Sequence, residues 1–346
     1  MSRINKIGVP RLIIICFFML LWILAAVKNL QVSILISNSL VRIGMNLIMV
    51  LAMVPAIRCG IGLNFALPIG IICGLLGSTC AIEFHETLNM SSGQAFLFAI
   101  IIAVPLAILL GWLYGKMLNK IKGSEMLVST YVGFSIVSLF CIAWIVLPFK
   151  SGLMRWPIGQ GLRTVVSLEG TFDKVLDSIW DFNIGAIHVP TGLLLFCAII
   201  CLIYWIFSHT RTGIALKTVG DNPKFAQSSG LNVDRYRILG TILSTVLGAI
   251  GMIAYAQSFG YLQLYAAPLM MAFPAVAAVL IGGASANKVN ISYVILGTIL
   301  FQGLLTIALP VASSFFEAGN ISEVIRMIVQ NGIILYALAQ GGKLYE

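Results

Sequence analysis

The sequence predicts an all-α, polytopic membrane protein with about ten transmembrane helices and both termini in the cytoplasm. Of its 346 residues, 60% are hydrophobic and only 10% are charged, whereas a soluble domain carries about 25% charged residues. The mean hydropathy is +1.02. Apolar segments recur from Leu12 to Ala339 and leave no polar block long enough to fold alone. We therefore treat residues 1–346 as a single transmembrane domain.

The charge balance fits the same prediction. A net charge of +9, from 21 Lys and Arg against 12 Asp and Glu, would suggest nucleic acid as the partner of a soluble protein. Here the basic residues gather at the ends of apolar segments, as the positive-inside rule expects. We therefore expect the lipid bilayer as a partner and no nucleic acid.

Apolar runs between charged or turn-rich breaks predict the individual spans, each of about 20 residues. The first could also be a signal peptide, but it ends in Lys28 without a clear cleavage site, so we predict a retained span. The ten predicted spans are 12–27, 41–57, 61–82, 95–115, 126–148, 189–207, 238–258, 267–285, 290–309 and 324–340.

Charge asymmetry supports this topology. With the N-terminus inside, fourteen basic and four acidic residues fall on the cytoplasmic side, and the other eight acidic residues fall outside. Losing one span would scramble this separation. Arg42 and Arg326 are expected near the outer ends of spans two and ten, where a long side chain can snorkel.

The outer loop 149–188 is longer than a hairpin needs. Its apolar residues recur at helical spacing with charged residues between them, which predicts an amphipathic helix. Such a helix could pack on the outer ends of the spans or dock an extracytoplasmic partner. The apolar positions are Phe172, Val175, Leu176, Ile179 and Trp180.

The inner loop 208–237 carries the clearest local signal. Asn222 is a suitable N-cap, Pro223 fits the first helical position, and Gly230 can end a helix in a left-handed conformation. A short helix of about two turns, Pro223 to Ser229, is therefore predicted between spans six and seven. Such a capped helix could transmit cytoplasmic movement into the bilayer.

The longer string around this helix matches a pattern that reads T-R-x-G, then G-x-N-P-x-A-A-x-x-S-G-[IV]-[NP]-V. It resembles the cytoplasmic loop of permease subunits of bacterial ABC importers of the ribose, galactose and xylose type. The matching positions are Thr210, Arg211, Gly213, Gly220, Asn222, Pro223, Ala226, Ser229, Gly230, Asn232 and Val233.

Weaker similarities to that family extend over most of the chain, in residues 128–133, 281–285 and 329–335. Two segments depart from the family pattern. Residues 62–68 replace its G-x-D-L-S-V-G, and residues 286–290 replace its glycine-rich stretch. These departures leave the identity of the cargo open.

The resemblance implies a translocation subunit that is not itself an enzyme. A separate ABC ATPase would bind ATP and Mg, so no cofactor is expected in this chain. An extracytoplasmic solute-binding protein would deliver cargo, and a second permease copy or paralogue would complete the pathway. We expect a multi-pass protein of the plasma (inner) membrane.

Helix 223–229 would then be the coupling helix, with Arg235 and Arg237 stabilising the docked loop. The residues predicted to couple this chain to the ATPase are Gly220, Asp221, Asn222, Pro223, Lys224, Phe225, Ala226, Ser229, Gly230 and Arg235.

Catalytic and metal chemistry are not indicated. The stretch from Gly111 to Lys116 is one residue short of a Walker A motif and lacks its Ser or Thr. Glu83, His85 and Glu86 could contact a metal, but a hydrated outer loop is the preferred interpretation. We therefore predict no catalytic residues and no metal ligands.

The solute is expected to be neutral and hydroxylated, such as a monosaccharide. No Asp or Glu falls inside a predicted span, which argues against a proton- or sodium-coupled carrier. The same importer class could instead carry nucleosides or branched-chain amino acids, and a secondary carrier or channel working without an ATPase is the rival of a different class.

Polar groups at membrane depth are the candidate pathway residues. Each could instead form a helix-to-helix hydrogen bond, worth about 0.6 kcal/mol on average. Residues 255–274, with Pro268 and Pro274, are the favoured lining region. The candidates are Asn46, Asn64, Thr130, Gln257, Tyr261, Tyr265, Gln302 and Asn331.

Overall fold

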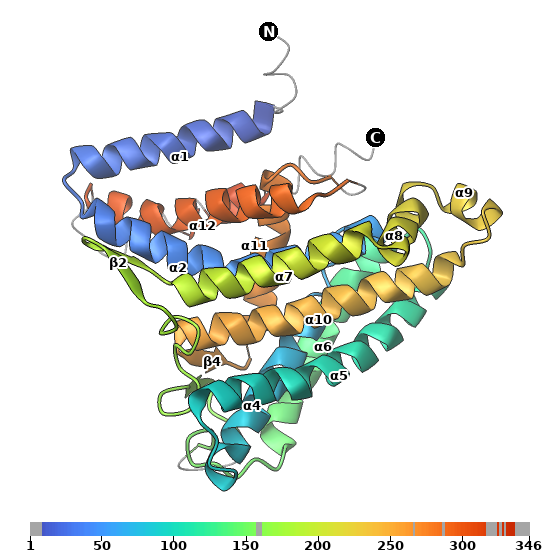
Figure 1. The fold of residues 1–346 in the computed structure, drawn as a ribbon, viewed down its shortest axis with the longest axis horizontal. Coiled ribbons are helices and arrows are strands. Elements are labelled where there is room, and N and C mark those ends of the chain that lie inside the picture. Colours follow the sequence, from blue (N-terminus) through green and yellow to red (C-terminus); the bar gives the residue numbers. More distant parts are fainter. Residues whose placement is uncertain are drawn as a thin grey trace.

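The computed structural model describes residues 9–156, 161–265, 267–285 and 288–315, together with 324, 327–328 and 330–335. Long helices run along the long axis of the molecule (Figure 1). The helices are α1 Val9–Val27, α2 Val32–Leu51, α3 Met53–Arg58, α4 Pro68–Thr87, α5 Ser92–Lys120, α6 Glu125–Val146, α7 Thr191–His209, α8 Arg211–Asp221, α9 Pro223–Ser228, α10 Val233–Phe259, α11 Ala267–Ile281 and α12 Ile291–Ser313.

Four strands of three residues, which the all-α prediction omits, complete the described elements. They are β1 Val165–Ser167, β2 Phe182–Ile184, β3 Ile187–Val189 and β4 Tyr261–Gln263. The first pairs with the last, and the middle two pair with each other, both in antiparallel register. Val166 faces Leu262 across the first pair, so the long outer loop is fixed to the residues that follow α10.

Seven helical segments of the described chain are long and apolar enough to cross a membrane, with α2 and α3 counted together as one segment of 27 residues. Two shorter apolar helices, Arg11–Val27 and Ala267–Ile281, bring the apolar segments to nine among the described residues. A mostly helical, polytopic fold is confirmed. The predicted span 324–340 lies largely outside those residues, so the count of ten stays a prediction.

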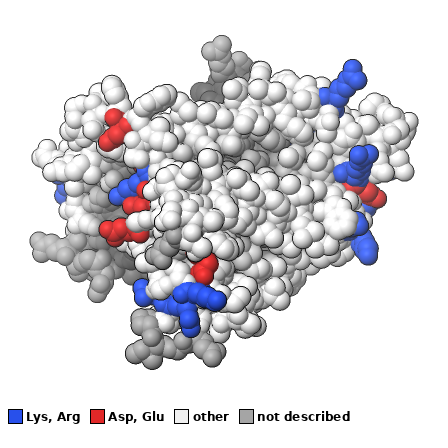
Figure 2. All heavy atoms as spheres, turned by 60° about the horizontal axis from the view of Figure 1, so that its bottom comes forward, with Lys and Arg blue, Asp and Glu red and all other residues white. Residues whose placement is uncertain are grey.

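The two ends of the long axis differ in content. Figure 1 shows α8 and α9 at one end and β2 and β4 at the other, which we call the α9 end and the β4 end. Predicted inner loops meet at the α9 end, because Lys122 pairs with Asp234 at 2.8 Å and Arg58 Nε donates to Val289 O at 3.4 Å. Figure 2 shows charged side chains at the right edge and over the left half, with an uncharged surface between them.

Helix α2 begins at Val32, nine residues before the predicted start of span two. Its polar N-terminal half stays helical because serine hydroxyls donate to carbonyls one turn earlier, Ser37 to Ser33 O at 3.0 Å and Ser39 to Leu35 O at 2.7 Å. The expectation that Arg42 lies near the outer end of its span is therefore wrong. It lies ten residues inside the helix.

Residues 59–67 interrupt the helical structure between α3 and α4, so the predicted span 61–82 is wrong at its start. Asn64, 1% exposed, holds this segment in place. Its amide nitrogen donates to Ser244 Oγ at 2.9 Å, and its carbonyl oxygen accepts from Ala66 N at 3.0 Å and from the Tyr114 hydroxyl at 3.2 Å. Irregular backbone at membrane depth is tolerated where protein buries it and satisfies its polar groups.

The predicted amphipathic helix in the outer loop is wrong, because residues 171–180 form successive turns. Lys174 and Trp180 have φ of 49° and 53°, a left-handed conformation that interrupts a regular helix. Gln257 on α10 accepts two backbone N–H groups of this segment. Lys174 N donates to its main-chain carbonyl oxygen at 2.8 Å, and Leu176 N donates to its side-chain Oε1 at 3.0 Å. Phe172 and Leu176 are buried, so the loop folds as a cap.

Small residues let α10 approach its neighbours closely. A Cβ on Gly70 or Gly74 of α4 would lie 2.5 Å from Thr245 O or 2.6 Å from Ala249 O. Such contacts between backbones are how membrane helices pack in the absence of a strong hydrophobic drive. Helices α4, α5 and α10 therefore form one tightly packed group, against which the functional elements at both ends are held.

Candidate functional site

Helix α9 runs from Pro223 to Ser228, one residue short of the prediction. Asn222 caps it as expected, because its Oδ1 accepts from Phe225 N at 3.0 Å. Gly230 follows with φ of 82°, the left-handed conformation that commonly ends a helix. Both local signals in the sequence were therefore read correctly.

The preceding helix α8 was not predicted. Thr210 caps it, since its hydroxyl oxygen accepts from Gly213 N at 3.2 Å, and Leu216 and Val219 turn inward and are buried. Asn232 caps α10 in the same way, accepting from Arg235 N at 3.0 Å. Three successive helix starts are thus capped by side chains, which leaves little freedom in the inner loop. The threonine before R-T-G and the asparagine before V-D were the available signals.

Gly220, near the end of α8, packs directly on the backbone that follows α3. A Cβ there would lie 2.1 Å from Arg58 O and 2.9 Å from Gly60 N. Gly60 itself has φ of 79°, so both residues at this contact are positions where a side chain is disfavoured. The inner loop therefore touches the α2–α3 segment through main-chain atoms, with no flexible side chain between them.

Arg237 pairs with Glu125 at the start of α6, and both side chains are largely buried, at 9% and 14% exposed. This arginine joins α10 to α6 inside the protein, and its role in stabilising a docked loop stays a prediction. Arg235 is exposed, and its role at a docked loop stays a prediction.

The surface of α9 divides into a buried and an exposed side. Ala226 is fully buried, and its carbonyl accepts from Leu231 N at 3.0 Å. Phe225 is 58% exposed although it is a large apolar residue. The other predicted coupling residues of this segment are exposed with it, namely Asp221, Asn222, Pro223, Lys224, Ser229 and Gly230.

A cavity of about 820 Å³ lies toward the β4 end, between α2, α10, α11 and α12. One face of α2 contributes Leu35, Asn38, Arg42, Met45 and Asn46, which recur at the three- and four-residue spacing of one helix side. The other lining residues include Tyr255, Ser258, Phe259, Met270, Met271, Pro274, Gln302, Leu305, Thr306, Leu309, Pro310 and Gln330.

Two of the candidate pathway residues, Asn46 and Gln302, line this cavity, and so do six positions in the favoured region 255–274, which include Pro274 but not Pro268. The remaining candidates lie elsewhere. Asn64 and Gln257 are buried, and their side chains form hydrogen bonds that hold the irregular segments 59–67 and 171–180. Those that do not line the cavity are Asn64, Thr130, Gln257, Tyr261, Tyr265 and Asn331.

These outlying residues have mostly structural partners. The Thr130 hydroxyl donates to Met126 O at 3.0 Å within its own helix. Tyr261 belongs to β4, and the Tyr265 hydroxyl donates to Leu162 O at 3.1 Å in the outer loop. Asn331 is exposed. Sequence reasoning missed Arg42 and Asn38 as lining residues because it assigned them to a span end and a loop.

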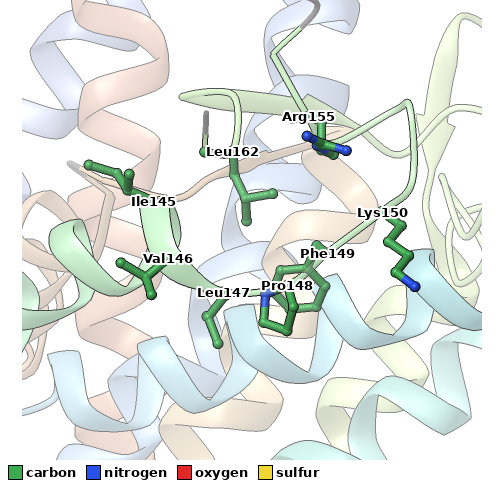
Figure 3. Close-up of a pocket in the computed structure, with 9 residues that line it drawn as sticks. Ile145, Val146, Leu147, Pro148, Phe149, Lys150, Arg155 and Leu162 are labelled. Carbon is green, nitrogen blue, oxygen red and sulfur yellow. The ribbon is translucent and has the colours of Figure 1, made fainter. Parts of the chain in front are cut away.

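A second cavity, of about 440 Å³, lies where α6 gives way to the outer loop (Figure 3). Apolar residues from Ile145 to Phe149 form one wall, and Lys150 and Arg155 are its charged lining residues. Glu83 accepts from Lys150 N at 2.9 Å and from Ser151 N at 2.9 Å. Glu83 therefore anchors the outer loop from within α4, so the expectation that it lies in a hydrated outer loop is wrong.

Electrostatics in the outer loop centre on Asp177. Burial raises the pKa of its carboxyl, and hydrogen bonds with Ser258 and Gln257 lower it. Its Oδ2 accepts from Gln257 Nε2 at 3.4 Å, whereas Oδ1 is buried without a partner among the described residues. In that same part of the chain, no group of three His, Cys, Asp or Glu could hold a metal ion.

A family comparison decides which class of membrane protein this is. The model of the family described as "Branched-chain amino acid transport system / permease component" matches residues 35–338. The chain belongs to this permease family. With its apolar helices, this permease is a multi-pass protein of the inner membrane.

Curated relatives of this permease match it in part. It is 43% identical over 70 residues to the nucleoside ABC transporter permease protein NupC of Lactococcus lactis, covering 20% of this chain and 22% of that protein. It is 23% identical to NupB of the same organism, covering 54% and 52%. It is 25% identical to the galactofuranose transporter permease protein YtfT of Escherichia coli, covering 46% and 48%. The permease thus spans about a fifth to a half of these relatives' lengths.

Proposed function

We propose that this chain is the membrane-spanning permease subunit of an ATP-driven importer, with α9 as the helix through which a separate ATPase moves it. The observation that carries the proposal is the geometry of the inner loop. A helix with an exposed Phe225 is capped at its start and seated on the membrane helices through Ala226. It can transmit a push because the loop behind it is rigid.

The proposed route of that push runs through the Gly220 contact. Movement of α8 and α9 would press Gly220 on Arg58 and Gly60, and α3 continues into α2, whose far half lines the large cavity. Arg58 also reaches Val289 O and lies 5.9 Å from the Tyr204 ring. The cytoplasmic end would thus be connected to α2, α7 and the α11–α12 loop together.

The proposed topology has ten spans with both termini in the cytoplasm. In that arrangement the α9 end faces the cytoplasm and the β4 end faces outward. The clustering of Arg58, Lys122 and Arg235 at the α9 end supports this orientation. An extracytoplasmic solute-binding protein would then approach the β4 end, and a second permease copy or paralogue would complete the pathway.

The proposed cargo is a monosaccharide or a similar hydroxylated solute. Amide and hydroxyl groups dominate the polar lining of the 820 Å³ cavity, including Asn38, Asn46, Gln302 and Thr306. These groups donate to and accept from sugar hydroxyls. The galactofuranose permease among the relatives supports this class.

Nucleosides are the second candidate, because two of the relatives are named nucleoside permeases and one shares 43% identity over its matched segment. A nucleoside also carries neighbouring hydroxyls on its ribose and adds an aromatic base. Tyr255, Met270 and Met271 in the cavity lining could pack against such a base. Branched-chain amino acids remain an alternative within the same importer class.

The test is ATP-dependent uptake by cells that express the chain with a candidate ATPase and binding protein. Galactose, ribose, adenosine and leucine serve as labelled solutes. Ala226→Pro removes the N–H that Ala226 donates to Asn222 O at 3.0 Å, so it breaks α9. We expect uptake to fall at least tenfold, while the ATPase still co-purifies and hydrolyses ATP.

The matched control is Gln227→Ala, the next residue, whose side chain is exposed. It should leave uptake unchanged. Normal uptake with Ala226→Pro would remove the coupling assignment. Uptake that persists without ATP or without any ATPase would replace the importer by a secondary carrier or channel.

A further inference from the structure

Arg42 lies well inside a membrane-spanning helix. It follows Val32, the first residue of α2, by ten positions, which is about 15 Å at 1.5 Å per residue. The segment Val32–Arg58 has 27 residues, about 40 Å in length. The arginine therefore lies nearer the middle of this segment than its end.

An arginine at the centre of a span costs about 2.5–3.5 kcal/mol on insertion scales, and one inside a span is retained mainly for function. Here the guanidinium has no ion pair or hydrogen bond with any residue that the structure describes. The three described ion pairs involve Lys122, His188 and Arg237. Arg42 is exposed, and what it is exposed to is the cavity.

Arg42 is the charged residue among the described residues that line the cavity. Among the described residues around this 820 Å³ cavity, there is no Asp or Glu and no second basic residue. Asn38 lies one turn before Arg42 and Asn46 one turn after it on the same face of α2. From the opposite side, α12 contributes Gln302 and Thr306. The site thus combines one cation with several uncharged hydrogen-bonding groups.

From this arrangement we propose that Arg42 makes the cavity a binding site for an oxygen-rich solute that is neutral or anionic, and that it excludes cationic solutes. The inference rests on the proposed importer function and narrows its cargo. The planar guanidinium donates two parallel hydrogen bonds to paired oxygens, such as neighbouring hydroxyls, a carboxylate or a phosphate. A cationic amine finds only like charge and no carboxylate.

The test measures the potential in the cavity without knowing the cargo. A single cysteine replaces Asn38, and its reaction rates with an anionic (MTSES) and a cationic (MTSET) methanethiosulfonate are compared in intact cells. The seven native cysteines give the background in the chain without this change. With Arg42→Gln, the ratio of anionic to cationic rate should fall on the order of tenfold, as expected for loss of one nearby charge.

Asn183→Cys, on exposed β2 at the same end, is the matched control, and its ratio should not respond to Arg42→Gln. An unchanged ratio at position 38 would overturn the proposal. It would mean that a partner's carboxylate already neutralises Arg42 or that the side chain lies elsewhere.

The solute itself is tested with whichever of galactose, ribose and adenosine the cells take up. Arg42→Gln and Arg42→Lys should each raise KM about tenfold, because only the planar guanidinium of arginine donates to two oxygens at once. Arg42→Lys keeps the positive charge, so it should leave the ratio of anionic to cationic reaction rates unchanged. An unchanged KM despite a changed ratio would also overturn the proposal. Absence of ATP-dependent uptake by the native chain would instead remove the importer function. The reaction rates at position 38 would still test the charge of the cavity, because they do not depend on uptake.

Discussion

The α9 end and the cavity near the β4 end use the same kinds of polar residue for opposite purposes. At the α9 end, Asn222 and Asn232 accept backbone N–H groups and start helices. In the cavity, Asn38 and Gln302 line the open volume, and their side chains make no hydrogen bond with the described residues. The difference lies in whether unpaired backbone donors are within reach. Asparagine is structural beside a helix start and becomes available for solute where the helix continues past it.

Breaking the buried ion pair should have the largest effect at the α9 end. Arg237→Ala leaves Glu125 buried without its partner, which costs about 3–5 kcal/mol in buried pairs. We expect a large loss of thermal stability in the purified protein. The exposed pair Lys122–Asp234 has side chains 53% and 55% exposed, so Lys122→Ala is the control and should cost little. Equal losses would contradict the burial argument.

Asn64 and Asn46 sharpen the comparison most directly. Asn64→Leu removes a hydrogen-bond partner from Ser244, Tyr114 and Ala66, and each buried group that stays unsatisfied costs about 1–3 kcal/mol. We expect a lower unfolding temperature and no specific change in KM for the protein that remains folded. Asn46→Leu should change KM more than stability, because Asn46 lines the cavity and the only hydrogen bond its side chain makes among the described residues is an exposed one, from its amide nitrogen to Arg42 O at 2.9 Å. The outcome is read from thermal unfolding together with uptake kinetics.

Gly220→Ala tests whether the inner loop acts through main-chain contact. Alanine normally stabilises a helix by about 1 kcal/mol relative to glycine, but here its Cβ meets Arg58 O, and overpacking costs about 1–3 kcal/mol. We expect uptake to fall several-fold at unchanged surface expression. Gly93→Ala, in the first turn of α5 with nothing within 4 Å of the added Cβ, should be neutral or stabilising.

Loss of the α9 cap should have a smaller effect. Asn222→Ala removes the acceptor for Phe225 N, at a cost of about 1 kcal/mol, so α9 frays and uptake per ATP hydrolysed falls. Asn222→Asp keeps an acceptor oxygen and should retain coupling. If the aspartate variant lost as much as the alanine variant, the side chain would act on the partner rather than on α9.

Replacing Asp177 should have the smallest effect on stability, and the direction in which that effect changes with pH follows from its pKa shift. Burial raises the folded pKa of its carboxyl, so the folded state holds the proton more tightly than the unfolded state. The contribution of Asp177 to stability is therefore most favourable at low pH, and is lost as pH rises from the unfolded pKa through the folded one. Asp177→Asn should slightly raise the unfolding temperature at pH 7 and flatten this dependence, as thermal unfolding at several pH values would show.

Local signals were read correctly and long-range ones were not. Asn222, Pro223 and Gly230 define α9 within nine residues, so the local sequence was sufficient to predict this helix. The turns at 171–180 depend on Gln257, which is 81 residues away from the Leu176 N–H that it accepts. The apolar residues there do have helical periodicity, but Gln257 and the pairing of the outer loop with β4 hold the segment in another conformation. These contacts come from residues distant in sequence, so local sequence patterns could not reveal them.

The cavity was partly foreseeable for a related reason. Asn46 and Gln302 were identified because amides stand out in apolar runs. Arg42 was misplaced because Ser37 and Ser39 were taken for a loop, although their hydroxyls are satisfied inside α2. Polarity alone does not end a membrane helix when each polar group can bond to the turn before it.

The hydrogen bond from Asn64 to Ser244 also constrains how the chain is made. The two residues are 180 positions apart, so Asn64 leaves the ribosome long before its partner exists. Until α10 has been synthesised, residues 59–67 lack the acceptor that holds them. The first half of the chain therefore reaches its final packing in the membrane only after α10 has been inserted.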